Sequence, residues 1–348
     1  MVTRTPIRAL STAVALVFLV GCSNGSAIAP KPSVPQGHAR TLMGRIPVVL
    51  SPIGMLRVNF NSGQRFMDFN RCPPAGPIEY ISDFNDNVID IYKGNFAGQT
   101  PCGRLTSGLL NPQGMFVKES THELYVANTN DHDVVVFRRG ATSPFKTYID
   151  STAGGQLPVD VTVAKDGTVM ATNIVDVGFN VGSLSTWHKD GAFVGNFPNP
   201  NGALDYFLTV QKDGTVYFDD NTPNLYKGSC PAGACGSFVA TGAKFVFPGG
   251  VRSADGDDVV LQDQEGAGGG DVLTYEPPDF GSPTSCAIGA GDPVSFDINR
   301  TQHHYFYTDA PNNIAVEIDY PSCALIGTVP GNTSGVLVGV ARDEPETL

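Results

Sequence analysis

Short apolar segments separated by polar turns run through most of the chain, and two of them share the same turn. Lys-Asp-Gly-Thr-Val occurs at residues 165–169 and again at 212–216, a spacing of 47 residues. Each copy follows a short apolar segment, such as residues 161–163, and leads into another, such as 169–171. Asp-Gly between alternating apolar segments predicts a β-hairpin in which both turn residues have positive φ. The chain is therefore expected to repeat a hairpin rather than a helix.

The second strand of each predicted hairpin ends in an acid or an amide, and these residues recur at intervals of 43 to 47 residues. A period near 45 residues, with about four short strands per unit, is typical of a β-propeller, whose blades bury their faces against their neighbours. Six such positions predict six blades in an all-β fold. The positions are Asp83, Asn128, Asn173, Asp220, Asp263 and Asp309.

The first predicted blade, which starts near Ile78, lacks an inner strand of its own. The last apolar segment of the chain, residues 335–340, has no partner in sequence order. We predict that this C-terminal strand completes the first blade and closes the ring, because closure removes an exposed sheet edge. The propeller is expected to span residues 78–348, and residues 46–77 are expected to form an N-terminal extension that packs on it.

Two segments of the second predicted blade resemble the NHL repeat. Residues 112–117 (PQGMFV) match its Pro-x-Gly and apolar strand, and residues 124–137 (LYVANTNDHDVVVF) match its Tyr-Val-Ala-Asp strand end with the following Asn. Residues 81–92 and 308–318 are similar to the second half of the repeat. The resemblance covers roughly residues 78–340 and implies a six-bladed propeller, a fold that serves both binding scaffolds and enzymes.

The chain departs from the NHL pattern at Asp205 and Phe207, which replace its Pro and Gly. It is also distantly similar to the regucalcin and gluconolactonase type of six-bladed propeller. That type holds one divalent metal through Glu, Asn and Asp and hydrolyses lactones. The first blade has no Glu at the matching position, since Glu79 is expected to lie before the strand.

Acidic residues outnumber basic ones by 34 to 22 in the 348-residue chain, which gives a formal net charge of −12. The acids are 26 Asp and only 8 Glu, and they accompany 40 Gly and 26 Pro. Asp, Gly and Pro favour turns, so this composition excludes a mostly helical protein. The acidic balance argues against nucleic-acid binding, because no basic patch is available to neutralise phosphates.

The first residues have the pattern of an export signal. Arg4 and Arg8 precede a mainly apolar segment of twelve residues, 9–20, which is too short for a typical membrane-spanning helix. The segment ends at Leu-Val-Gly-Cys22, which resembles the lipobox of bacterial lipoproteins and marks Cys22 for lipidation. An ordinary signal peptide with an incidental cysteine is the alternative.

The lipobox divides the N-terminal region into two expected parts. Residues 1–21 would be a lipoprotein signal peptide, and residues 22–45, rich in Pro and small polar residues, a flexible tether. The implied location is the bacterial cell envelope, outside the cytoplasm, with attachment to the membrane through the N-terminal lipid.

Six cysteines remain when Cys22 carries the lipid. An even number in an exported chain favours disulfides, although the sequence alone allows fifteen pairings. Zinc is the alternative at Cys230 and Cys235, but neither a second close Cys pair nor a His pair lies nearby. Proximity along the chain suggests the pairs Cys72–Cys102, Cys230–Cys235 and Cys286–Cys323.

The six strand-end residues are expected to surround one mouth of the central channel. Their carboxylate and amide oxygens are the kind of ligand that Ca²⁺ prefers, so they are the candidate metal or ligand site. The alternative is that each side chain caps its own strand end through an Asx-turn, as in ordinary NHL repeats. Ca²⁺ is the only cofactor that this pattern suggests.

Three functions remain open at this stage. The first is a monomeric binding module that recognises a protein or a glycan through loops on the same face as the strand-end residues. The second is a metal-dependent lactonase or esterase that uses those residues. The third, a lyase with a His base, lacks a His with an assured partner, because His122, His303 and His304 are expected in hairpins on the opposite face.

Overall fold

The computed structural model describes residues 68–94, 96, 99–149, 156–176, 181–254, 257–266, 269–289 and 291–344. The predicted signal peptide (1–21), Cys22, the tether (22–45) and most of the 46–77 extension lie outside the described residues. No helix among the described residues is long and apolar enough to cross a membrane.

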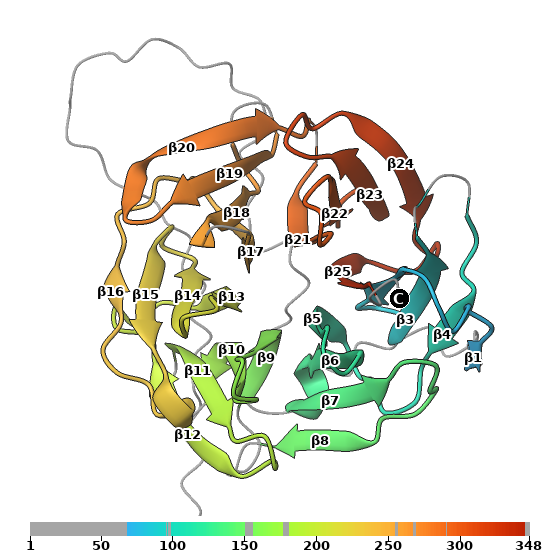
Figure 1. The fold of residues 1–348 in the computed structure, drawn as a ribbon, viewed down its shortest axis with the longest axis horizontal. Helices are drawn as coiled ribbons and strands as arrows, with labels where there is room; N and C mark the ends of the chain where they lie inside the picture. Colours follow the sequence, from blue (N-terminus) through green and yellow to red (C-terminus); the bar gives the residue numbers. More distant parts are fainter. Residues whose placement is uncertain are drawn as a thin grey trace, which may run out of the picture. The chain divides into compact units, whose positions relative to one another are not determined.

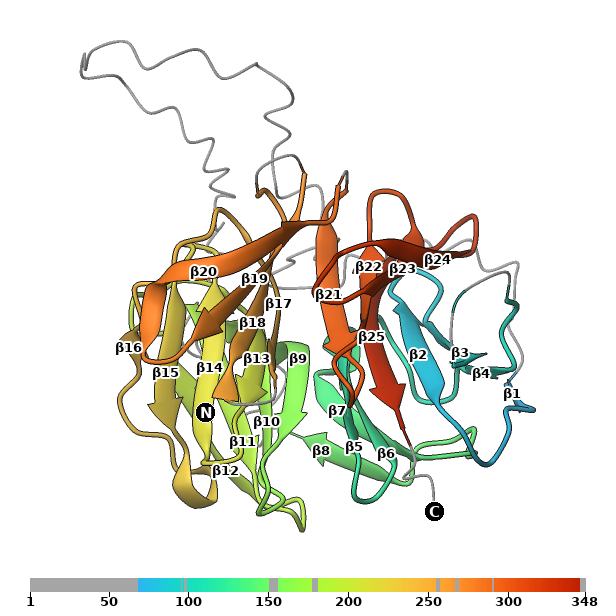
Figure 2. The same cartoon turned by 45° about the horizontal axis from the view of Figure 1, so that its top comes forward.

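Six antiparallel sheets lie around a central axis and form a six-bladed β-propeller, as Figures 1 and 2 show. The prediction of an all-β fold with six blades is confirmed. The inner strands that surround the axis are β25 (Leu337–Asp343), β5 (Pro112–Lys118), β9 (Gln156–Val163), β13 (Asp205–Val210), β17 (Pro248–Ser253) and β21 (Pro293–Ile298) for blades 1 to 6.

The other strands of each blade follow outward from the inner one. The second strands are β2 (Ile78–Asp83), β6 (Glu123–Asn128), β10 (Val169–Asp176), β14 (Thr215–Asp220), β18 (Val259–Asp263) and β22 (His304–Asp309). The third strands are β3 (Val88–Lys93), β7 (Asp133–Arg138), β11 (Val181–Trp187), β15 (Leu225–Ser229), β19 (Asp271–Glu276) and β23 (Ile314–Asp319). The outer strands are β4 (Gly103–Leu105), β8 (Lys146–Ile149), β12 (Phe193–Pro198), β16 (Val239–Ala240), β20 (Asp279–Ala287) and β24 (Leu325–Pro330).

The C-terminal strand closes the ring, as predicted. β25 pairs with β2 over the register Ile78↔Asp343 to Asp83↔Leu337 and is the inner strand of blade 1. In Figure 1 it lies in red beside the blue and teal strands of that blade. The short strand β1 (Phe69–Asn70) pairs with β4 and adds a fifth strand to its outer edge. Glu79 lies inside β2, which corrects the expectation that it precedes the strand.

The repeated Asp-Gly turns differ from the prediction in their backbone. Gly167 and Gly214 have positive φ (92° and 91°), but Asp166 and Asp213 do not. The Asp166 carboxylate instead accepts a hydrogen bond from Thr168 N at 2.8 Å. The hairpins are therefore longer turns that end in one left-handed Gly, a geometry that also matches the twist of the strands.

Every inner strand contains a β-bulge at the same place. The register slips by one residue between Pro112 and Met115 in blade 2, and between the equivalent positions of the other blades. A bulge bends its strand and reverses which side chains face the axis. The bulges of neighbouring blades lie very close together. A Cβ on Gly114 would come within 2.2 Å of Asp160 Oδ1, which is why this position needs Gly.

Apolar and aromatic side chains fill the spaces between blades. Trp187 on β11 is buried against Tyr148 of blade 2, with ring centroids 6.0 Å apart, and its Nε1 donates to Ile149 O at 3.0 Å. This places the only tryptophan of the chain between blades 2 and 3. Burial of a large ring with its N–H satisfied stabilises the contact of two neighbouring blades.

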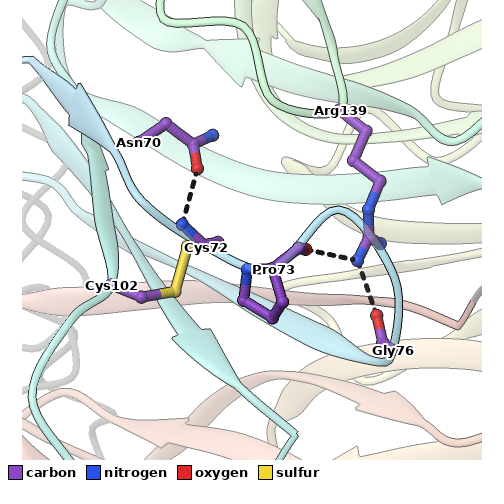
Figure 3. The surroundings of a disulfide bond; sticks show 6 residues. All are labelled: Asn70, Cys72, Pro73, Gly76, Cys102 and Arg139. Carbon is purple, nitrogen blue, oxygen red and sulfur yellow. Dashed lines mark hydrogen bonds between the residues drawn. A yellow bond between two sulfur atoms is a disulfide. The ribbon is translucent and has the colours of Figure 1, made fainter.

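The three disulfides that proximity suggested are present: Cys72–Cys102, Cys230–Cys235 and Cys286–Cys323. The first joins the segment after β1 to the start of β4 (Figure 3). Arg139 of blade 2 reaches the same segment and donates to Gly76 O at 2.5 Å. Three disulfides indicate an oxidising environment outside the cytoplasm.

The closing strand is held by an ion-pair cluster near its end. Asp343, fully buried, accepts from Arg139 Nη1 at 2.5 Å and contacts His122 Nδ1 at 2.7 Å. Both partners belong to blade 2. The carboxylate of Asp343 therefore ties the last strand of the ring to the neighbouring blade.

Candidate functional site

We call the face where the second strands end the upper face, and the face with the hairpins between first and second strands the lower face. Five of the six predicted site residues are the last residues of their second strands, and Asn173 lies in β10 at the equivalent register. All six are buried. The contacts of their side chains decide whether these residues can bind a metal or a ligand.

Three of these side chains hold the loops that lead into the inner strands. Asp83 Oδ1 accepts from Val336 N at 3.0 Å, and Asn128 Oδ1 accepts from Leu110 N at 2.6 Å. Asp263 accepts from the backbone N–H groups of two consecutive residues, Val246 and Phe247, at 2.8 and 3.0 Å. Each of these three loops is thus fixed to its own blade by a strand-end side chain.

The other three side chains also bond within their blades or to an adjoining loop. Asn173 Nδ2 donates to the hydroxyls of Ser183 and Ser185 at 3.0 and 2.7 Å. Asp220 Oδ1 caps the following turn by accepting from Thr222 N at 2.8 Å. Asp309 Oδ2 accepts from Asn312 Nδ2 at 2.7 Å.

This arrangement does not fit a calcium site. Calcium takes six to eight oxygens that converge on one point, whereas these oxygens point back to separate loops. Among the described residues, no group of three or more His, Cys, Asp or Glu is placed to hold a metal. Among the six strand-end residues, Asp83 differs in one respect, because its Oδ2 is buried without a hydrogen-bond partner. Burial raises the pKa of Asp83 to about 6.

Two further acids lie in blade 4 beside the predicted residues. Asp205 begins β13 and Asp219 precedes Asp220, and both are fully buried. Asn199 Nδ2 donates to Asp205 Oδ1 at 2.5 Å and to Asp220 Oδ2 at 3.3 Å. Burial raises the pKa of Asp205 and of Asp219 well above the usual range.

The central channel is crossed by a buried ion pair. Arg252 on β17 extends to Asp160 on β9, with Nη1 to Oδ2 at 2.8 Å. The same guanidinium donates to Met115 O and Leu208 O, at 3.1 and 3.3 Å. Arg252 therefore contacts blades 2, 3 and 4 from its place in blade 5, and Asp160 is fully buried beneath it.

A cavity of about 420 Å³ opens on the lower face below this ion pair. We call it the lower funnel. All six inner strands line it, through Phe116, Val163, Thr209, Arg252, Asp297 and Arg342. Hairpin residues that include Lys118, Lys165 and Arg300 form its rim. Its volume is in the range of small-molecule sites, and polar and charged residues outnumber apolar ones in its lining.

Charged groups of both signs line the lower funnel. Asp297 accepts from Ile298 N and from Arg342 N at 2.9 and 2.8 Å. Burial raises the pKa of Asp297 to about 6, although Arg252 and Arg342 beside it act in the opposite direction. Arg342 also pairs with Glu344 (2.5 Å) and with the buried Glu79.

His122, His303 and His304 lie in lower-face hairpins, as predicted, whereas His132 follows the upper end of β6 and its Nδ1 is 2.6 Å from Gln156 O. His304 Nδ1 is 2.8 Å from Glu317 Oε1, and His122 contacts Asp343. Glu317 is fully buried and also accepts from Phe96 N at 2.9 Å. The His304–Glu317 pair lies within blade 6, whereas the bond from Phe96 N to Glu317 and the His122–Asp343 pair each join neighbouring blades. His188 lines a second, shallow depression with Lys189 and Asp190.

Sequence reasoning did not identify the lower funnel. Arg252 and Asp160 are 92 residues apart and lie on different blades. One signal was present: Arg252 is a cation at an inner-strand position where the other blades carry Phe, Thr, Thr, Asp and Ala. A charged residue that breaks an internal repeat marks a place with its own role.

No protein-family model matches the chain, and no curated protein matches it by sequence. Among solved structures it is similar to a chain in the crystal structure of a nidogen/laminin complex, with a TM-score of 0.61 and 13% identity over 77% of this chain and 98% of that one. It is similar to a catalytically inactive virginiamycin B lyase from Staphylococcus aureus with quinupristin, with a TM-score of 0.51 and 15% identity over 78% and 91%.

A third similar structure is the hydrazine synthase of Kuenenia stuttgartiensis, with a TM-score of 0.50 and 12% identity over 72% of this chain and 83% of that one. At identities this low the likeness concerns the fold alone. Together with the ring of six sheets, these comparisons show that the chain is a six-bladed β-propeller.

Proposed function

We propose that the chain is a binding module that recognises a protein or a glycan through the loops of its upper face. The observation that carries this proposal is the use of the strand-end side chains. They fix the upper loops to rigid strands by hydrogen bonds such as Asp263 to Val246 N and Asn128 to Leu110 N. Loops held in one conformation bind with a smaller entropy cost, which suits recognition.

The similar structures are compatible with this use of the fold and also with catalysis. One comes from a complex of nidogen with laminin, and another is a lyase. NHL-like propellers are likewise used as scaffolds, and we assign the repeats of this chain to that type. The assignment rests on the motifs at residues 112–117 and 124–137.

The module would be attached to a bacterial envelope membrane by lipid on Cys22, with residues 23–45 as the tether. The disulfides support a location outside the cytoplasm. Replacing Cys22 with Ala should release the protein from membranes and abolish labelling by a palmitate analogue. Membrane-bound and labelled Cys22→Ala protein would contradict the anchor.

The alternative is a metal-dependent lactonase or esterase on the upper face. It is favoured by one observation, the buried and unpartnered Asp83 Oδ2 at a ring of carboxylates. Asp83 and its counterparts would have to exchange backbone hydrogen bonds for a metal. That rearrangement makes this alternative the weaker one.

Site-specific photo-crosslinking in the native host tests the binding module. Pro223 and Pro311 are exposed in upper loops, and Ser322 is exposed in a turn of the lower face. A photoreactive residue at position 223 or 311 should give a discrete protein or glycan adduct, and one at position 322 should not. Adducts equal at all three positions, or none at the upper ones, would refute upper-face recognition.

Metal content and thermal melting separate the alternative from the binding module. We expect neither Ca²⁺ nor a chelator to shift the melting temperature, because a ligand that does not bind the native state cannot stabilise it. A stoichiometric metal, with a melting temperature that rises with Ca²⁺, would favour the hydrolase. Lactone and ester hydrolysis would then be measured on the wild type and on Asp83→Ala.

A further inference from the structure

The lower funnel is separate from the upper face, because the Arg252–Asp160 pair crosses the channel between them. It is enclosed by all six inner strands and has a volume of about 420 Å³. A cavity of this size and concavity holds a small molecule rather than a protein loop. Its chemistry can be read from its lining.

The lining reverses the charge balance of the whole chain. The protein carries 34 acids and 22 basic residues, but five cationic side chains and only three acidic ones line the funnel. The cationic ones are Lys118, Lys165, Arg252, Arg300 and Arg342. A cavity with low-dielectric walls concentrates the field of such charges and attracts ions of opposite sign.

All three acids in the lining are already held by protein groups. Glu344 accepts from Arg342 Nε and from Arg300 N, and Asp297 accepts two backbone N–H groups. Glu119 lies 3.8 Å from Arg300 Nη2. By contrast, the ammonium groups of Lys118 and Lys165 have no hydrogen bond or ion pair among the described residues. Two unpaired cations on adjacent blades therefore face one side of the funnel.

The uncharged part of the wall combines apolar side chains with Ser120, Thr209 and Ser253. Phe116, Val163, Val210 and Ile298 line the funnel between the charged groups. An inorganic anion would leave these side chains in contact with water, whereas a ligand with an apolar body would cover them. Covering apolar surface contributes about 25 cal/mol per Å² before the entropy costs of binding.

We propose that the lower funnel binds a small organic anion, with its carboxylate or phosphate at Lys118 and Lys165 and its apolar body against Phe116, Val163, Val210 and Ile298. Arg252 forms the floor. Its guanidinium is held by Asp160 and three backbone carbonyls, so its charge is already paired and the cations left for the anion are Lys118 and Lys165. This site does not depend on the function proposed for the upper face.

Calorimetry with the purified full-length protein tests the proposal with three probes. 2-Naphthoate carries both an anionic group and an apolar body, 2-naphthamide has the same body without the charge, and inorganic phosphate has the charge without the body. Saturable binding of 2-naphthoate, at least about tenfold tighter than either other probe, is expected. Equal binding of 2-naphthamide, or no saturable binding of 2-naphthoate, would overturn the proposal.

The repeated turn provides a matched control variant. Lys165 and Lys212 occupy the same position in the two Lys-Asp-Gly-Thr-Val turns, but only Lys165 lines the funnel. Lys118→Ala/Lys165→Ala should weaken 2-naphthoate binding about tenfold or more, and Lys118→Ala/Lys212→Ala by clearly less. Lys165→Arg should retain binding, since it keeps the charge. Equal losses in the two double variants would refute the site, and unchanged melting temperatures would show that both variants remain folded.

Discussion

The two ends of the central channel are made by the same six blades but follow opposite rules. On the upper face, every blade places an acid or an amide at the same position, and each side chain hydrogen-bonds to its own blade or to an adjoining loop. On the lower side, one equivalent position of the inner strands holds six residues of five kinds: Phe116, Thr162, Thr209, Arg252, Asp297 and Ala341.

This contrast separates residues that recur in every blade from residues that occur in one blade only. A residue type that recurs in every blade solves a problem that every blade has, here the capping of a strand end and the fixing of a loop. A charged residue that occurs in one blade only does not follow from the repeat. The repeated ring is therefore the weaker place to look for chemistry, and the irregular funnel is the stronger one.

The largest effect is expected from Arg252, which would test whether an irregular residue also supports the ring. Arg252→Met leaves the fully buried Asp160 carboxylate without its cation, which typically costs about 3–5 kcal/mol. Urea unfolding would measure the loss. Adding Asp160→Asn should recover part of it, because the buried charge is removed. A double variant no more stable than Arg252→Met would contradict this account.

An intermediate loss of stability is expected when a strand-end residue of the upper face is removed. Its size should differ between blade 5 and blade 6. Asp263→Ala removes the acceptor for Val246 N, Phe247 N and Glu265 N, and leaving the buried Phe247 N–H without a partner costs about 1–3 kcal/mol. Asp309→Ala affects mainly the exposed Asn312, which water can satisfy, so its cost should be below about 1 kcal/mol. Urea midpoints measured with and without Ca²⁺ would compare the two. Equal costs would show that the ring residues do not act as loop caps.

The smallest effect is expected from pH at the funnel. The pKa of Asp297 is raised to about 6, so the carboxylate becomes neutral below that pH and no longer repels a bound anion. Arg252 and Arg342 face it and stay charged. Glu79, also within electrostatic reach, has a pKa raised by burial to about 8, and thus titrates above this window.

The affinity for 2-naphthoate should therefore rise a few-fold between about pH 7 and about pH 5, while Asp297→Asn should show almost no change. The sign for stability is consistent with this. A raised folded-state pKa means that the contribution of Asp297 is greatest below its unfolded pKa and is lost as the pH rises through about 6. An affinity that falls on acidification would contradict the assignment.

The blades and the closing strand could be predicted because their signals are local or periodic. The strand ends recur about every 45 residues, and one apolar segment was left without a partner. The funnel could not be predicted, because the direction of Arg252 depends on the bulge between Pro248 and Val251, which changes the alternation of side chains.

The closing strand also has a consequence for the order of folding. Blade 1 cannot be completed until residues 337–343 reach β2, and the bond from Val336 N to Asp83 joins residues 253 positions apart. A contact this distant in sequence forms late and slowly, since the intervening chain must first be ordered. Five blades can assemble in sequence order while the first remains incomplete. During that interval the unpaired edge of β2 is the part of the molecule most exposed to wrong pairing, and arrival of the last strand ends that risk.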